Sequence, residues 1–470
     1  MNNNCSDFQQ IQPCSSMNYF VEKIENSFFA NTAFIDGKTI IRYSEFCENI
    51  RKCVSYFRRF ERRYYNINTL SAYYFSMAYL AVVCSGNVAV LSKQPILTDP
   101  SGKIPVYKVT EKILRDAISN ECPSDIFIST DTEAIATVAQ SSGTTSVAKG
   151  VALSQKALLC NMHAGMTAIK FDESFRYLHV IPYYHLFGLV SNMLAPLYVG
   201  ATICDSGKPL SVYSDFLKYN ISATCLPPVL VTGLWNMIER YGFENITGGY
   251  LKKIICAGAP PDFSVYDGFE KIGVHIFTGY GLTECAPCVS VNGDYANKIG
   301  SCGLPVICNK VKIVDGEIAV KGDNLMLGYW EAPIETEKVI VDGWLMTGDL
   351  GYIDDDGFLF VTGRKNNLIV FENGEKLIPE QLEKELCEIS EVIESMVTEL
   401  RTAEKVLLNI TVVSTKEKHS IESKVKQILE KAQLLSRLHI VNVTSESLEK
   451  SILGKVKRKN ELMKEGNLKT

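Results

Sequence analysis

The sequence predicts an α/β fold over most of its length and a separate, smaller α+β domain at the C-terminal end. Three observations support this prediction. Short apolar strand patterns alternate with helical patterns between residues 134 and 281, which is typical of layered, mostly parallel sheets with helices. Between about residues 298 and 363, short β segments separated by glycine and aspartate turns indicate a small β subdomain. Beyond Arg364, strand and helix patterns continue for about 105 residues, enough for a second domain.

The first domain contains two helical patterns near its start, an amphipathic one over 43–57 and an apolar one over 73–84. A strand over 135–140 then leads through a glycine-rich turn, 141–150, into a helix over 153–166. Further short strands are predicted at Tyr177–Pro182, Ala201–Asp205, Leu251–Gly258 and Gly273–Gly281.

The second domain begins with a predicted hairpin over 368–378, because Asn373-Gly374 is a favoured two-residue turn. A helix is expected to begin near Pro379, since proline suits the first helical turn. Strands over 406–414 and 438–443 flank a helix. That helix has an apolar face made of Ile421, Val425, Ile428, Leu429 and Ala432.

Composition narrows the class of protein. With 46% hydrophobic and 21% charged residues the chain is ordinary and globular, which excludes disordered, collagen-like and low-complexity classes. A net charge of −5 argues against a nucleic-acid partner but leaves room for a local anion site. The longest apolar stretch, 72–84, is too short to cross a bilayer, and the polar N-terminus lacks a secretory pattern. We expect a cytoplasmic protein without integral membrane association.

The fifteen cysteines are odd in number and scattered, which does not suggest a disulfide framework. We expect reduced thiols that pack as small apolar groups. The pair Cys285-x-x-Cys288 could belong to a metal or redox site. Cys302 and Cys308, which follow, are too widely spaced for a zinc ribbon, so this alternative is the less favoured one.

The glycine-rich turn 141–150 is the first segment that suggests chemistry. Four hydroxyl side chains surround a glycine, and Lys149 follows them. Backbone N–H groups, hydroxyls and an ammonium suit a polyphosphate. The pattern is not a P-loop, because no serine or threonine follows Lys149. Taken alone, an ordinary polar turn is the simpler interpretation.

The second segment, Thr278–Glu284, follows an apolar strand. Glu284 occupies the place of the third glycine of a dinucleotide fingerprint, so that fingerprint is rejected. The ring of Tyr280 could instead stack on a base, and the Glu284 carboxylate could hold Mg²⁺. The alternative is a turn with a solvated glutamate.

Two further segments contain polar residues with an ordinary and a functional interpretation. Asp349 lies in a Thr-Gly-Asp turn and could accept hydrogen bonds from ribose hydroxyls. Arg364 could bind a phosphate or pair with a surface acid. The tail around Lys455 is, on charge alone, a solvated basic segment.

In this order and spacing, the four segments resemble the motifs of the adenylate-forming (AMP-binding) superfamily, and within it the acyl-CoA synthetase or acid–thiol ligase type. The resemblance covers nearly the whole chain. The other segments that match in family order are Ile181–Gly188, Ala257–Pro260, Gly316–Glu317, Gly328–Trp330, Gly374–Pro379 and Gly454–Arg458.

The resemblance implies a two-step reaction that uses ATP, Mg²⁺ and coenzyme A (CoA). A carboxylate attacks the α-phosphorus of ATP, pyrophosphate leaves, and the thiol of CoA then displaces AMP from the acyl-adenylate. One alternative is an acyl-AMP ligase that loads the phosphopantetheine of a carrier protein. Another is a catalytically silent homologue that binds a nucleotide or a partner, because fold alone does not fix function.

The segment 183–191 indicates which class of carboxylic acid the protein would activate. Relatives that activate α-amino acids have an aspartate in this region, and here no acidic residue occurs. The apolar side chains of Phe187, Leu189 and Val190 favour a fatty or aryl acid.

The resemblance also implies roles for single residues. Lys455 would bridge the carboxylate and the α-phosphate, Glu284 would ligate Mg²⁺, and Thr283 would bind the α-phosphate. Asp349 and Arg364 would hold the ribose, and Tyr280 would stack on adenine. His185 would lie between the acid and thiol sites. The remaining nucleotide-binding residues would be Ser141, Ser142, Gly143, Thr144, Thr145, Lys149, Gly258, Ala259, Pro260 and Gly281.

The motif order divides the chain into an AMP-binding domain, 1–365, and a mobile C-terminal lid domain, 366–470, that carries Lys455. Some residues depart from the family pattern and leave phosphate-loop and hinge behaviour open. The departures are Ser146 and Ala148 in the phosphate loop, Asn366 at the hinge and Glu449 before the last motif.

Overall fold

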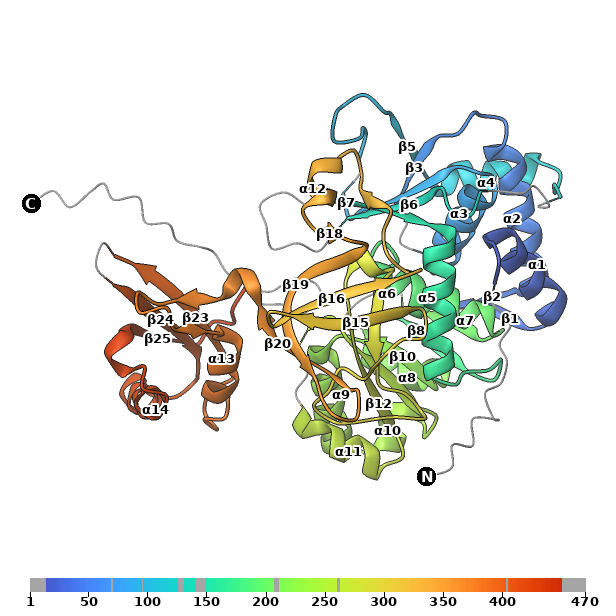
Figure 1. Cartoon of the computed structure of the whole chain (residues 1–470). Helices are drawn as coiled ribbons and strands as arrows, with labels where there is room; N and C mark the ends of the chain where they lie inside the picture. Colours follow the sequence, from blue (N-terminus) through green and yellow to red (C-terminus); the bar gives the residue numbers. More distant parts are fainter. Residues whose placement is uncertain are drawn as a thin grey trace, which may run out of the picture. The chain divides into compact units, whose positions relative to one another are not determined.

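The computed structural model describes residues 14–68, 71–94, 96–125, 131–140, 149–206, 211–259, 263–402 and 405–449 (Figure 1). The chain forms two compact units. The first comprises 1–312, 319–347 and 353–360, and the second comprises 313–318, 348–352 and 361–470. The sequence-predicted boundary between 365 and 366 falls inside the last stretch of the second unit.

A nine-stranded sheet is the largest element of the first unit, with the order β14-β13-β12-β11-β10-β8-β9-β1-β2. Neighbours from β12 to β1 are parallel, and the pairs at both ends are antiparallel. The prediction of a mostly parallel sheet is therefore confirmed. The strands are β1 Thr32–Asp36, β2 Thr39–Arg42, β8 Arg176–His179, β9 Thr202–Asp205, β10 Ala223–Leu226, β11 Lys253–Cys256, β12 His275–Gly281, β13 Cys288–Val291 and β14 Leu304–Pro305.

A second sheet has the order β17-β7-β6-β4-β3-β5 and is parallel from β6 to β5. The strands are β3 Tyr64–Ile67, β4 Val88–Leu91, β5 Val106–Val109, β6 Ile135–Gln140, β7 Gly150–Ser154 and β17 Gly328–Tyr329. The expected order of strand, turn and helix was incomplete, because strand β7 lies between the turn and the helix. The chain returns antiparallel to β6, with Gln140 opposite Gly150, before helix α5 begins at Gln155.

Helices cover these sheets and fill the space between them. Helix α3 (Ala72–Cys84) is buried almost throughout, as its apolar sequence predicts. Helix α5 (Gln155–Ala168) contacts β13 of the nine-stranded sheet and β6 and β7 of the other, so it joins the two layers (Figure 1). The other helices of the first unit are α1 Met17–Phe28, α2 Tyr43–Phe57, α4 Glu111–Asn120, α6 Leu186–Leu189, α7 Ala195–Tyr198, α8 Val212–Tyr219, α9 Pro228–Tyr241, α10 Phe243–Thr247, α11 Tyr266–Lys271 and α12 Pro333–Glu337.

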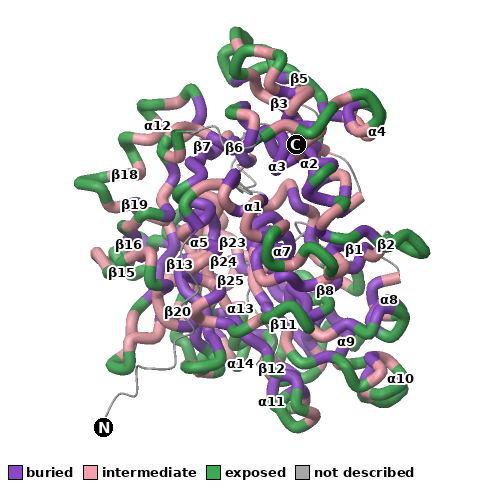
Figure 2. Tube along the Cα trace, turned by 90° about the vertical axis from the view of Figure 1, so that its right-hand side faces the viewer, coloured by how far each residue is buried: buried purple, intermediate pink, exposed green. Residues whose placement is uncertain are grey.

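One hydrophobic core of the first unit lies where α8, α9 and α11 pack on the nine-stranded sheet. Phe216 and Phe269 from the helices meet Leu178 and Ile254 from the strands, all fully buried. Strands β10, β11 and β13 of this sheet are almost entirely buried, whereas the turn before β5 is exposed and green in Figure 2. Within the described residues, no helix combines the length and apolarity needed to cross a bilayer.

The predicted small β subdomain corresponds to a five-stranded sheet of order β15-β16-β19-β18, with β20 paired to β19. Its strands are β15 Asn309–Val314, β16 Glu317–Gly322, β18 Ile340–Val341, β19 Trp344–Ile353 and β20 Leu359–Arg364.

The C-terminal part of the second unit follows the predicted pattern closely. Strands β21 (Ile369–Val370) and β22 (Lys376–Leu377) form the expected hairpin, and Gly374 supplies a positive φ of 82° in its turn. Helix α13 (Pro379–Cys387) begins at the predicted proline.

A three-stranded sheet completes the second unit. Strand β24 (Val406–Val413) lies between antiparallel β23 (Glu394–Arg401) and parallel β25 (Leu438–Thr444). Helix α14 (Lys418–Lys431) buries Ile421, Val425 and Leu429. Strand β23 is the element that the sequence interpretation missed.

Candidate active site

Three segments that hold predicted site residues lie at one edge of the nine-stranded sheet, whereas Lys149 lies beside β7 of the six-stranded sheet. In a parallel sheet the carboxyl ends of the strands share an edge, which is where ligands bind in α/β proteins. Strand β8 ends at His179 and leads to His185. Strand β11 leads to Gly258 and Ala259, and β12 ends in the segment that holds Tyr280 and Glu284. We call this the C-terminal edge.

Gly281 is the last residue of β12, and only a glycine fits at this position. A Cβ atom at this position would lie 2.1 Å from the carbonyl oxygen of Pro287, so any larger residue would force the backbone to move. The chain therefore folds back tightly on itself at this point. Thr283 and Glu284 follow in a short 3-10 turn, Thr283–Cys285.

The carboxylate of Glu284 is oriented by a tyrosine from another element. The hydroxyl of Tyr329, in β17, donates a hydrogen bond to Oε1 of Glu284 at 3.1 Å. Burial raises the pKa of Tyr329, and the charge of Glu284 raises it further, so the phenol stays protonated as a donor. The backbone of Glu284 is also held, because its carbonyl accepts from the Met326 N–H at 2.8 Å.

Two buried asparagines hold the turn that follows Glu284. The Nδ2 atom of Asn161 donates to the carbonyls of Cys285 and Cys288 at 3.2 and 2.7 Å, and its Oδ1 accepts from the Cys288 N–H at 3.1 Å. The Nδ2 atom of Asn324 donates to the same two carbonyls at 2.9 and 3.0 Å. Asn161 and Asn324 are 1% and 0% exposed, so water cannot replace these donors.

Lys149, directly before β7, contacts the ring of Tyr329 in the neighbouring strand β17. Its Nζ atom lies 4.7 Å from the ring centroid of Tyr329 and 2.9 Å from Oε2 of Glu335. The side chain of Tyr329 thus contacts both Lys149 and Glu284. The structure brings together the lysine that ends the glycine-rich loop and the glutamate of the second motif.

Asp349 and Arg364 form an ion pair in the second unit. Nε of Arg364 lies 2.8 Å from Oδ1 of Asp349, whose side chain is 5% exposed. Glu317 supports the same turn, because its Oε1 accepts from the Gly348 N–H at 2.9 Å and its Oε2 lies 2.6 Å from Lys365 Nζ. The role of Glu317 in holding this turn was not predicted.

His185 lies at the N-cap position of α6, at the C-terminal edge. Its Nε2 atom is buried and has no hydrogen-bond partner among the described residues. Burial, with a smaller contribution from the charge of Lys93, lowers the pKa of His185 to about 4. The imidazole is therefore neutral near pH 7, which keeps a ring nitrogen available as an acceptor.

A second histidine at this edge was missed. Nδ1 of His179 lies 3.1 Å from Oδ1 of Asp205, and these are opposed residues at the ends of β8 and β9. The Oδ2 atom of Asp205 accepts from the N–H of Ala72 at the start of α3. The ring of His179 lies 4.0 Å from that of Tyr183, so this pair supports the segment that leads to His185.

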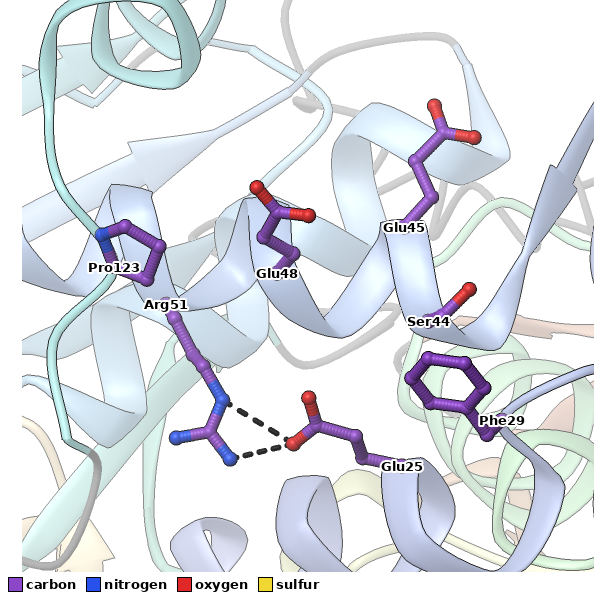
Figure 3. Close-up of a pocket in the computed structure, with 7 residues that line it drawn as sticks. All are labelled: Glu25, Phe29, Ser44, Glu45, Glu48, Arg51 and Pro123. Carbon is purple, nitrogen blue, oxygen red and sulfur yellow. Dashed lines mark hydrogen bonds and ion pairs between the residues drawn. The ribbon is translucent and has the colours of Figure 1, made fainter.

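A groove of about 460 Å³ beside α1 and α2 is lined by none of the predicted site residues that the structure describes (Figure 3). It is lined by Glu25, Phe29, Ser44, Glu45, Glu48, Arg51 and Pro123. The guanidinium of Arg51 already pairs with Glu25. Since three carboxylates outnumber one arginine, the groove does not suit a polyphosphate.

The family profile described as "AMP-binding enzyme" matches residues 68–330, more than half of the chain. The chain belongs to this family. The match includes every described motif residue of the first unit, from Lys149 to Tyr329.

Named relatives of this family member are acid–CoA ligases. A long-chain-fatty-acid–CoA ligase of Salmonella typhimurium is 33% identical over 281 residues, which cover 56% of this chain and 49% of the relative. A 2-succinylbenzoate–CoA ligase of Bacillus pumilus is 29% identical over 328 residues, 66% of this chain and 65% of the relative. The chain thus spans about half the length of the fatty-acid ligases that it matches.

Solved structures share the fold over almost the whole chain. ATP-bound MatB from Rhodopseudomonas palustris superimposes with a TM-score of 0.82 at 20% identity, covering 94% of this chain and 97% of that one. The AMP complex of MenE from Bacillus subtilis gives a TM-score of 0.79 at 21% identity, covering 96% and 98%. The predicted fold class is confirmed.

Some predicted site residues lie outside the described part of the chain. These are Ser141, Ser142, Gly143, Thr144, Thr145, Pro260 and Lys455, together with the departures Ser146 and Ala148. Their roles stay predictions.

We expect Asn324→Ala to loosen the turn after Glu284, because two buried carbonyls lose a donor, at a cost of about 1–3 kcal/mol. Amide hydrogen exchange of the peptide covering 284–289 in the full chain measures this directly. It should quicken at least about fivefold, since about 1 kcal/mol corresponds to roughly a factor of five. Asn120→Ala, an exposed asparagine on α4, is the control and should leave exchange there unchanged. Unaltered exchange in Asn324→Ala would contradict the assigned role.

His185 should make the stability of the fold depend on pH. Its pKa is about 4 when folded and about 6.5 when unfolded, so the unfolded chain binds more protons between these values. The free energy of unfolding therefore rises with pH across this range, with a share from His185 on the order of 2–3 kcal/mol. His185→Gln should remove that share in urea unfolding at pH 4.5 and 7. His275→Gln, half-exposed in the same unit, is the control. An unchanged pH slope in His185→Gln would refute the assignment.

Proposed function

We propose that the chain uses ATP to activate a carboxylic acid as an acyl-adenylate and then transfers the acyl group to the thiol of CoA. One observation carries the proposal within the AMP-binding family. The Glu284 carboxylate is fixed at the C-terminal edge by Tyr329, and the ring of Tyr329 also meets Lys149. A fixed carboxylate and a nearby ammonium are the groups that a magnesium–polyphosphate needs.

Magnesium fits the chemistry of Glu284. Mg²⁺ prefers oxygen ligands and is usually held by one or two carboxylates, with water and substrate phosphates completing its shell. A solved structure with the same fold, MenE from Bacillus subtilis, was obtained in complex with ATP and a magnesium ion. The bound ion would offset negative charge on the phosphates.

The proposed roles of the other residues follow the two steps. Thr283 and the glycine-rich loop bind phosphates, and Tyr280 with the segment 258–260 receives the adenine. Asp349 and Arg364 bind the ribose hydroxyls, which suits their fixed mutual geometry. Neutral His185 accepts or donates one hydrogen bond beside the reacting acyl group, and its buried Nε2, which has no hydrogen-bond partner among the described residues, supports this role.

Electrostatics governs the first step. The substrate carboxylate and the α-phosphate are both anionic, so cationic groups must lower their repulsion as the new C–O–P bond forms and pyrophosphate leaves. We propose Lys455 for this task. In the second step the thiol sulfur attacks the acyl carbon, AMP leaves with the C–O bonding pair, and the thiol proton is released.

The proposed acid is fatty or aryl. The buried side chains of Leu189 and Val190 lie just after His185 and give its surroundings an apolar character. The named relatives act on a long-chain fatty acid and on 2-succinylbenzoate, one from each class. A cytoplasmic location belongs to the same proposal, and free thiols such as those of Cys47, Cys53 and Cys84 support it.

Lys455→Ala separates the two steps. We expect acid-dependent pyrophosphate release to fall about 100-fold or more, because the charge stabilisation of the first transition state is lost. Thioester formation from a supplied acyl-adenylate and CoA should change by no more than a few-fold. Lys457→Ala removes the same charge from the same tail and is the matched control, with both steps retained. Equal loss of both steps in Lys455→Ala would contradict the proposed role of Lys455 in the first step.

A further inference from the structure

A histidine–aspartate pair lies at the C-terminal edge, outside the roles assigned so far. His179 ends β8 and Asp205 ends β9, and the two residues are opposed in the parallel register of these strands. Nδ1 of His179 lies 3.1 Å from Oδ1 of Asp205, and the side chains are 12% and 8% exposed. An ionised carboxylate only accepts hydrogen bonds, so the Nδ1 atom of His179 carries the proton that this contact requires.

Asp205 is itself fixed by the start of a helix. Its Oδ2 atom accepts from the N–H of Ala72 at 2.8 Å, and Ala72 is the first residue of α3. The N-terminus of a helix stabilises negative charge, which favours the ionised form of the carboxylate. Asp205 therefore sets both the direction and the tautomer of the His179 ring, with the proton on Nδ1 and the lone pair on Nε2.

The Nε2 atom of His179 is buried and has no hydrogen-bond partner within the described ranges. The same is true of Nε2 of His185 and of both side-chain polar atoms of Asn192, which is 0% exposed. All three residues are linked to Tyr183. Its ring lies 4.0 Å from that of His179, its hydroxyl donates to the Asn192 carbonyl at 3.3 Å, and His185 follows two positions later. Because an unsatisfied buried polar atom costs about 1–3 kcal/mol, this cluster favours a polar ligand beside Tyr183.

We propose that His179 is the base that removes the proton from the thiol in the second step, and that Asp205 orients it. The inference rests on the proposed function, because that step consumes a thiol and no residue has so far been assigned to take its proton. CoA and a phosphopantetheine arm end in the same thiol, so the role of His179 does not depend on which of them is the acceptor.

The chemistry of the substrates selects the thiol as the donor to Nε2. The acid enters as a carboxylate and the phosphates of ATP are ionised, so both only accept hydrogen bonds. The ribose hydroxyls are proposed for Asp349 and Arg364, and the adenine for Tyr280. The S–H group is the remaining donor of the proposed reaction, and a lone pair fixed on Nε2 of His179 matches it.

Of the two histidines at this edge, His185 is less suited to remove a proton. Burial, with a smaller contribution from the charge of Lys93, lowers its pKa to about 4, and a base this weak takes a thiol proton poorly. His179 lies against the carboxylate of Asp205 instead. The negative charge of that carboxylate stabilises the imidazolium that forms when the ring accepts a second proton.

The proposed step balances in atoms and electrons. The S–H bond breaks as the proton passes to Nε2 of His179, and the sulfur electron pair forms the bond to the acyl carbon. The C–O bond to AMP then breaks, and its electron pair leaves with the phosphate oxygen. The Nδ1 proton stays between the ring and Asp205 throughout. Transfer of the Nε2 proton to water finally restores the neutral ring.

The test measures the two steps separately in the full chain. In His179→Gln, thioester formation from a supplied acyl-adenylate and CoA should fall about 100-fold, because a positioned base typically contributes about 10²–10⁴ in rate. Acid-dependent pyrophosphate release should stay within about threefold, since the first step moves no thiol proton. Asp205→Asn should lower thioester formation about tenfold or more, because the ring loses its orienting charge.

His275→Gln is the matched control. His275 also pairs with a carboxylate, that of Glu270 at 3.0 Å, but it is half-exposed and lies at the opposite end of its strand, at the start of β12. Both steps should therefore be retained in this variant.

Chemical rescue distinguishes proton transfer from a merely structural role. In His179→Ala, added imidazole should raise thioester formation at least about tenfold, after subtraction of the rate without protein, because a free base can take the proton in the space that the ring leaves. Pyrazole has nearly the same shape and is a much weaker base, so it should not restore the rate.

Three results would overturn the inference. They are full thioester formation in His179→Gln, equal rescue of His179→Ala by imidazole and pyrazole, and equal loss of both steps in His179→Gln without rescue of His179→Ala by imidazole. Failure of the proposed function is distinguishable from these. In that case the unaltered chain itself releases no pyrophosphate with any acid and forms no thioester from a supplied acyl-adenylate.

Discussion

The hydrogen bonds from Asn161 and Asn324 to the carbonyls of Cys285 and Cys288 are the constraint on which the C-terminal edge depends. A turn that folds back as tightly as this one leaves carbonyls pointing away from any sheet or helix, and buried carbonyls need donors. Here the donors come from α5 and from the segment after β16. The position of Glu284 is therefore set by elements distant in sequence, and through α5 by the packing of both large sheets.

Tyr329 adds the electrostatic part of the arrangement. Strand β17 joins the edge of the six-stranded sheet next to β7, and this pairing places the tyrosine between Lys149 and Glu284. The hydrogen bond from the Tyr329 phenol fixes the direction of the half-buried Glu284 carboxylate. Such a carboxylate can receive a magnesium ion, whereas one locked in a salt bridge would first have to release its partner.

The elements that the sequence predicted well are those with a local signal. The apolar run of α3, the hairpin turn at Gly374 and the apolar face of α14 depend on neighbouring residues, and all three occur as expected. Strands β7 and β23 were missed because each is defined by its pairing with another strand. β7 is also only five residues long and runs directly into α5.

The same distinction applies to the candidate site: residues in sequence motifs could be predicted, and residues that act through distant contacts could not. Ordered motifs identified Glu284, Asp349 and Arg364, and the structure pairs the last two. Asn161, Asn324 and Glu317 were not assigned supporting roles, because their importance lies in contacts with residues up to about 125 positions away. A polar residue among the apolar positions of a helix, such as Asn161 between Leu159 and Met162, is the one signal that could have indicated a buried donor.

The most direct measurement is acid-dependent release of pyrophosphate from ATP by the full chain, across a panel of fatty and aryl acids, with and without CoA. The account predicts release with at least one acid in either class, dependent on magnesium, and an acyl-CoA thioester when CoA is present. Pyrophosphate release without thioester formation would indicate that a carrier protein, and not CoA, accepts the acyl group in the second step. No release with any acid would contradict the account and leave a nucleotide-binding protein without this chemistry.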